Sequence, residues 1–98
     1  MENLLDIIKD HLRIAWDDED EALIALIKRA QANLCELVGL GLDFEKEGLA
    51  QALLINYVRY DYNNALEYFE ENFRKEILRL QLQEAAKDRD RNDSGQEV

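Results

Sequence analysis

The stretch DEDEALIALIKRAQANLCELVG, residues 18–39, decides the fold of this chain. Its apolar residues recur every three or four positions and would form one continuous stripe on a helix. They are Leu23, Ile27, Ala30, Leu34 and Leu37. Acidic residues precede the stripe, where they favour a helix N-terminus, and Gly39 follows it, where a glycine commonly ends a helix. We therefore predict a helix over residues 18–38 that packs with one side against the rest of the chain.

The segments around this helix are also typical of helices. Residues 3–12 place apolar side chains on one face, and a short connection over residues 13–17 follows. Residues 49–62 are apolar almost all round, which is typical of a helix buried on most sides. The loop between, Gly39–Gly48, has alternating apolar residues, so a short extended piece is possible there.

A last helix is predicted from Asn63 or Asn64 to about Gln83. Glu67, three residues after Asn64, would complete a capping box. The expected outer face carries acid–base pairs four residues apart, and the expected buried face carries large apolar residues. The pairs are Glu70–Arg74 and Glu71–Lys75, and the apolar residues are Leu66, Phe69, Phe73, Ile77 and Leu80.

Composition indicates one small all-α domain. The chain has 98 residues, no proline and four glycines, so long stretches lack helix breakers. Hydrophobic residues make up 47% of it, which is typical of a globular chain. We predict a bundle of about four helices over residues 1–83. Residues 84–98 lack apolar periodicity and are predicted to be a disordered acidic tail.

The apolar third segment suggests that copies of the chain associate. A small domain has few layers with which to cover a helix that is apolar all round, so neighbouring copies are expected to cover it. Tyr57, Tyr60 and Tyr62 are the candidate subunit-interface residues. Reading these tyrosines with Tyr68, Phe69 and Phe73 as a stacking platform for bases is less favoured, because lysines and arginines are not clustered around them.

Charge and residue content argue against several other functions. With 22 acidic and 12 basic residues the net charge is −10, and no segment of the chain is basic. We therefore expect no sequence-specific binding of nucleic acid. Residues 17–21 are acidic but do not fit a calcium-binding loop, so helix capping is preferred and a weak cation site is the alternative. His11 is the only histidine and Cys35 the only cysteine, the latter expected in the core. We expect no metal, no cofactor and no enzymatic activity.

The sequence also lacks the pattern of a targeting or membrane segment. No basic stretch followed by an apolar block begins the chain, and the longest apolar run is short for a membrane span. The chain is expected to be made as a soluble intracellular protein without membrane association.

The order of these segments resembles a known family. LLDIIKDHLRIAWDDEDEALIALIKRAQANLCELVG, residues 4–39, looks like the opening of the bacteriophage head–tail connector family, also called head-completion or adaptor proteins. The carrying features are a short helix, the Leu12-Arg13-Ile14 step, an acidic turn and a long helix ending at glycine. LAQALLINYVRYDYNNALEYFEENFRKEILRLQ, residues 49–81, is similar to versions from phages and prophages of Gram-positive bacteria. The loop at 39–48 lacks the proline that some relatives carry.

The resemblance implies a structural subunit of the virion, made in the host bacterial cytoplasm and located at the head–tail interface. It implies a homo-oligomeric ring under the portal protein that extends the DNA channel and offers a docking surface to the next connector, stopper or tail protein. Self-repulsion at −10 per copy predicts that free subunits are monomers.

Two segments are candidate contacts in such a particle. The segment from Arg79 to Val98 is the candidate portal-docking segment, and the loop is the candidate channel or tail-side surface. The portal-docking residues are Arg79, Gln83, Lys87, Arg89 and Arg91. The loop residues are Leu40, Leu42, Asp43, Phe44 and Glu45.

Two other classes of binding protein remain alternatives. An acidic helical regulator, such as an antirepressor or a DNA mimic that occupies a DNA-binding protein, would share the size and charge. A small helix-turn-helix DNA binder is disfavoured because no basic recognition helix is present.

Overall fold

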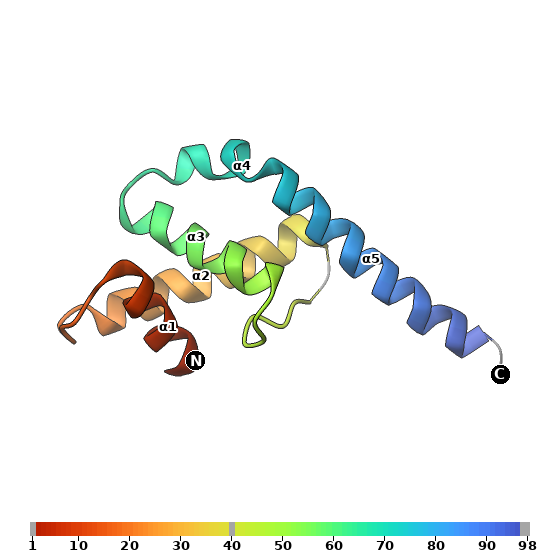
Figure 1. The fold of residues 1–98 in the computed structure, drawn as a ribbon, viewed down its shortest axis with the longest axis horizontal. Helices are drawn as coiled ribbons and strands as arrows, with labels where there is room; N and C mark the ends of the chain where they lie inside the picture. Colours follow the sequence, from red (N-terminus) through yellow and green to blue (C-terminus); the bar gives the residue numbers. More distant parts are fainter. Residues whose placement is uncertain (1, 40, 97–98) are drawn as a thin grey trace.

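The fold is all-α, as the sequence predicts. A computed structural model describes the backbone of residues 2–39 and 41–96, and the side chains of residues 4–39 and 41–87. The elements are α1 (Glu2–Leu12), α2 (Asp20–Val38), α3 (Leu49–Tyr62), the 3-10 turn η1 (Leu66–Tyr68), α4 (Phe69–Asn72) and α5 (Arg74–Gln96) (Figure 1). Within the described ranges there is no strand, so the loop before α3 has no β-structure.

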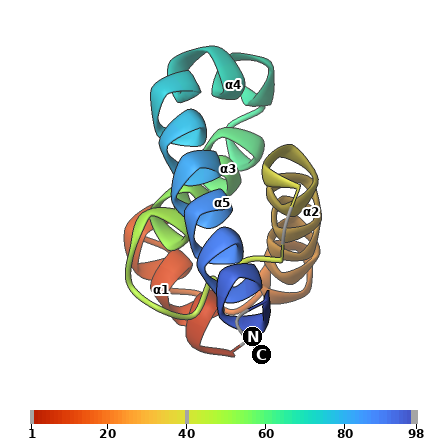
Figure 2. The same cartoon turned by 90° about the vertical axis from the view of Figure 1, so that its right-hand side faces the viewer.

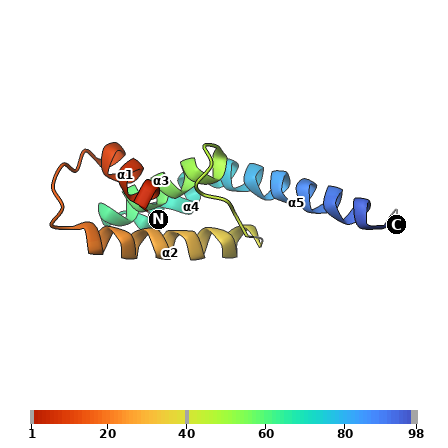
Figure 3. The same cartoon turned by 90° about the horizontal axis from the view of Figure 1, so that it is seen from below.

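The core forms where α3 lies between α2 and the other helices. Seen from below, α2 makes one layer, with α1, α3 and α4 above it (Figure 3). The view along the long axis places α2 on one side of the molecule and α1 on the other, with α5 running in front between them (Figure 2). The predicted stripe of α2 is buried at Leu23, Ile27, Ala30 and Leu34, while Leu37 is partly buried. The core side of α3 consists of Leu53, Leu54, Ile55, Tyr57 and Val58.

Two helices end in the same hydrogen-bonded motif, with a non-glycine residue in the left-handed region. Arg13 has φ 60° and follows α1, where the amide of Ile14 donates to the carbonyl of Lys9 at 2.8 Å. Asn64 has φ 58° and follows α3, where the amide of Ala65 donates to the carbonyl of Tyr60 at 2.8 Å. This bond, from the residue after the left-handed one back to a carbonyl five residues earlier, is the Schellman ending. Gly39, at φ 83°, ends α2 as predicted.

Asn64 therefore ends a helix, and the prediction that it begins one is wrong. Asparagine tolerates the left-handed region because its short polar side chain bonds locally, so the residue types of helix starts and helix ends overlap. The side chain of Asn63 also caps α3 by donating to the carbonyl of Arg59 at 2.8 Å.

The predicted last helix is interrupted and consists of η1, α4 and α5. Phe73 lies at the break between α4 and α5, with φ −115° and ψ 21°. The break removes the helical register between residues 70–71 and 74–75. No ion pair forms between Glu70 and Arg74, or between Glu71 and Lys75, in this described part of the chain. The two expected surface pairs are therefore absent, and their charges remain available.

Helix α5 continues past the end predicted at Gln83. Its backbone is helical through Gln96, across residues expected to form a disordered tail. Alanines 85 and 86, Lys87 and the two arginines that follow are good helix formers, whereas residues 92–95 are not, so helix propensity accounts for the continuation only to about residue 91. Figure 1 shows this part of α5 extending away from the other helices, and the molecule is 53 Å long in this direction. The division into a domain of residues 1–83 and a tail of residues 84–98 stays a prediction.

The burial pattern predicts which leucines stabilise the fold. Leu54 is fully buried, so Leu54→Ala should lower the free energy of unfolding by about 2–5 kcal/mol, because it removes apolar contacts and leaves a cavity. Leu82 is 63% exposed, so Leu82→Ala should change it by less than about 0.5 kcal/mol. Urea unfolding followed by circular dichroism measures both variants. Equal losses in the two would contradict the placement of the core.

The left-handed residue after α1 gives a second prediction. Arg13→Gly should raise the free energy of unfolding by about 0.5–1 kcal/mol, because glycine adopts φ 60° without the steric penalty that other residues carry. Arg13→Ala is the matched control, since it removes the same exposed side chain and keeps the penalty. A gain for alanine as large as that for glycine would show that the side chain, rather than the backbone, is the cause.

Candidate functional site

The structure brings together the two segments expected to contact other proteins. Arg79, Gln83 and Lys87 are exposed and stand one helical turn apart on α5. Gln83 and Lys87 line a shallow depression of about 240 Å³, together with Asp43, Lys46 and Glu47 of the loop. Lys87 forms an ion pair of 3.1 Å with Glu84. The side chains of Arg89 and Arg91 lie outside the described residues.

Within the loop, only part of the predicted surface faces outward. Phe44 is 5% exposed, and its carbonyl accepts a 3.1 Å hydrogen bond from the buried side chain of Gln51. Leu42 also packs against the core. These two are therefore anchors of the loop, because their apolar side chains gain more from burial than from solvent. Asp43 and Glu45 are exposed, with the Asp43 carboxylate accepting the Glu45 amide at 3.1 Å, and Leu40 lies outside the described residues.

The tyrosines of α3 make contacts within the chain. Tyr57 is 6% exposed, and its hydroxyl accepts a 2.5 Å hydrogen bond from Asn33 of α2. Tyr60 packs edge-on against Phe69 and Phe73, with ring centroids 5.9 and 5.5 Å apart. Tyr62 donates to the carboxylate of Glu19 at 3.1 Å, and this bond holds the pKa of the tyrosine above its usual value. The expectation that other copies must cover this helix loses its basis, because the chain covers α3 itself.

Acidic residues just before and at the start of α2 bond to Lys9 of α1 and to Trp16 of the connection between the two helices. The ammonium of Lys9 lies 2.7 Å from the carboxylates of both Asp17 and Asp20. Glu19 accepts a hydrogen bond from the Trp16 indole at 2.6 Å and stands at the start of α2 without a side-chain capping bond. The acids therefore stabilise a tertiary contact in addition to the predicted role at the helix start, since Asp20 and Glu21 lie in the first turn of α2 and the Asp17 side chain is largely exposed.

The Lys9 contacts predict how stability depends on pH. The hydrogen bond from Lys9 lowers the pKa of Asp17, so this contribution is complete above the ordinary value of 3.8 and is lost as the pH falls below it. The bonds to Asp17 and Asp20 raise the pKa of Lys9, so its contribution is complete below 10.5 and is lost above it. Lys9→Met should therefore destabilise the protein at neutral pH and lose this effect at both extremes.

Urea unfolding across the pH range tests this expectation. Lys28→Met is the matched control, because Lys28 is exposed and forms no ion pair in the described part of the chain. A loss for Lys9→Met that is the same at pH 3, 7 and 11 would assign the effect to packing of the aliphatic stem instead of the ion pairs.

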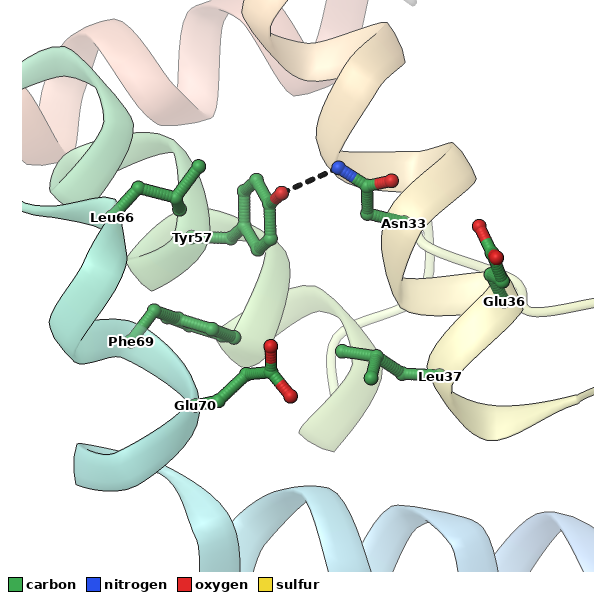
Figure 4. Close-up of a pocket in the computed structure, with 7 residues that line it drawn as sticks. All are labelled: Asn33, Glu36, Leu37, Tyr57, Leu66, Phe69 and Glu70. Carbon is green, nitrogen blue, oxygen red and sulfur yellow. Dashed lines mark hydrogen bonds between the residues drawn. The ribbon is translucent and has the colours of Figure 1, made fainter.

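A second hollow lies between α2 and α4. Its volume is about 580 Å³, within the range of about 300–1,000 Å³ typical of binding pockets. Apolar side chains form the floor, and Glu36 of α2 and Glu70 of α4 stand on opposite sides (Figure 4). The lining residues are Asn33, Glu36, Leu37, Tyr57, Leu66, Phe69 and Glu70. We call this hollow the α2–α4 pocket.

Two exposed leucines of α5 were not among the residues that sequence reasoning singled out. Leu78 is 54% exposed and Leu82 is 63% exposed. The available signal was their position four residues apart and off the stripe formed by Ile77 and Leu80, which are buried. The two side chains lie one helical turn apart, so they form a small exposed apolar area on α5.

In the described residues, no group of three or more histidine, cysteine, aspartate or glutamate side chains is placed to hold a metal ion. Cys35 is partly buried against the core, consistent with the packing role expected of it. Over the same residues, no helix is long and apolar enough to cross a membrane.

Comparisons of the chain with protein-family models, with characterised proteins and with solved structures found no match.

Proposed function

We propose that this protein is a structural subunit of a tailed-bacteriophage particle, a head–tail connector without enzymatic activity. The observation that carries the proposal is the shared surface made by the loop before α3 and the projecting helix α5. A helix that extends from a small body offers area to a partner while the body keeps its own core. The order of helices that resembles the connector family supports the same role.

In this proposal, the α5 face of Arg79, Gln83 and Lys87 docks on the portal protein. These residues form a ridge with two positive charges on a chain whose net charge is −10, so an acidic portal surface would select this ridge. Asp43 and Glu45 of the loop lie near the channel or meet the next connector, stopper or tail protein. Acidic side chains facing the channel would repel DNA phosphates, so DNA would slide past without being held.

Assembly then depends on the portal. Free copies repel one another at low salt and are monomers, whereas a portal ring gathers many copies at high local concentration. The ring forms in the host bacterial cytoplasm during assembly and remains in the virion.

Portal binding by charge-reversal variants tests the docking ridge. Arg79→Glu with Lys87→Glu should weaken binding to purified portal at least tenfold, because both positive charges of the ridge become negative. Arg13→Glu with Lys28→Glu is the matched control, since it changes the net charge equally at the other end of the molecule and should leave binding nearly unchanged. Sedimentation of labelled chain with portal measures both.

Two results would overturn the proposal. The first is an absence of added ring density in electron micrographs of the wild-type chain mixed with portal from the same phage or prophage. The second is tight binding to a basic DNA-binding protein with no binding to portal, which would favour an acidic regulator.

A further inference from the structure

The α2–α4 pocket has the character of a docking site for a basic, apolar helix face. Leu37, Leu66 and Phe69 provide an apolar floor, and the rim carries the carboxylates of Glu36 and Glu70 (Figure 4). Both glutamates are exposed, and neither forms an ion pair with the residues whose side chains are described. A cation placed between them would meet two unpaired negative charges above an apolar surface.

The outer face of α5 carries the matching chemistry. Lys75, Leu78 and Leu82 are spaced by three and four residues, so they share one face of the helix. All three are exposed, and Lys75 has no ion pair within the described part of the chain because the break at Phe73 separates it from Glu71. We call these three residues the α5 stripe.

The pocket and the stripe belong to one continuous surface. Leu78 lines a further hollow, separate from the depression beside Gln83 and from the α2–α4 pocket. Leu37 and Glu70 line both this hollow and the α2–α4 pocket. One end of this surface is therefore acidic and concave, and the other is basic, apolar and convex. The two ends complement each other in charge and shape, so another copy of the chain has what the pocket lacks.

We propose that the α2–α4 pocket of one copy receives the α5 stripe of a second copy. Leu78 and Leu82 of the second copy cover the apolar floor, and the ammonium of Lys75 lies between Glu36 and Glu70. Reciprocal exchange of this contact between two copies would close a dimer, whereas passing it on to a third copy produces a ring or an open chain, and the connector role requires the second arrangement. This inference rests on the proposed function, because it supplies the contact between neighbours in the connector ring.

The contact is weak on its own. Two leucines and one lysine bury less surface than the roughly 1,000 Å² of a stable interface. The remaining surface of each copy is acidic and repels its neighbour, since the net charge is −10. Copies held side by side on a portal would form the contact readily, because their local concentration is high.

Charge reversals on each side of the contact test the inference. Glu36→Lys with Glu70→Lys changes the net charge from −10 to −6, so general repulsion predicts stronger self-association. The proposed contact predicts the opposite, a weakening of at least tenfold. Lys75→Glu should weaken self-association similarly, and the chain with all three changes should recover most of it. Analytical ultracentrifugation at about 0.15 M salt, over micromolar to millimolar concentrations, measures each dissociation constant.

Two further variants complete the experiment. Asp18→Lys with Glu21→Lys is the matched control, because both residues are exposed at the far end of α2 and the net charge changes equally; its self-association should be unchanged or stronger. Leu78→Ser with Leu82→Ser should abolish self-association while circular dichroism keeps the helical signal, since both leucines are exposed.

The outcomes separate this inference from the proposed function. Self-association that is absent in the wild type, or unaffected by Glu36→Lys with Glu70→Lys, overturns the inference. The inference is also overturned if the pocket variant still self-associates but no longer binds some other protein that the wild-type chain binds. Portal binding is measured separately on single copies at low concentration: its absence would overturn the proposed function, whereas the paired charge reversals would still decide whether copies meet through this contact.

Discussion

The structure depends on covering α3. This helix is apolar almost all round, and burial of its side chains is the largest favourable contribution available to a chain of this size. The chain achieves it by placing α2 along one side and bringing α1, α4 and α5 to the others. Tyr57 and Tyr62 then use their hydroxyls to bond α3 to Asn33 and Glu19. An amphipathic tyrosine suits this position because its ring is buried while its hydroxyl finds a partner at the edge.

This covering changes the reason for expecting copies to associate. The sequence suggests that α3 needs neighbours, whereas in the described part of the chain the large apolar residues left exposed lie outside α3. They are Trp16, Tyr68, Leu78 and Leu82, and the last two lie on the outer side of α5. In the proposed function, contact between copies is therefore a property of the outer side of α5 and is separate from the covering of α3. Such a subunit would be a monomer when free and would assemble on the portal.

Helix positions were predictable from periodicity, and their ends only partly. The stripe of α2 and the bounds of α3 follow from apolar spacing, and Gly39 ends α2 because glycine adopts the left-handed region freely. The end at Asn64 and the break at Phe73 were not predictable, since asparagine serves helix starts and ends alike and phenylalanine breaks no helix by itself. At the break, Phe69 and Phe73 stack with ring centroids 5.1 Å apart and both contact Tyr60, so the aromatic side chains on either side of it pack on α3.

The same break explains why the candidate surfaces were only partly predictable. An unbroken helix would place Glu71 beside Lys75, and their charges would neutralise each other within the chain. With the helix interrupted, Glu70 turns to the rim of the α2–α4 pocket and Lys75 remains on the outside of α5. The negative charge of Glu70 and the positive charge of Lys75 therefore stay at separate places on the surface. Opposite charges at separate places make the two sides of a contact different, so they fix how one subunit is oriented relative to the next. Contacts between identical subunits in a ring require such a fixed orientation.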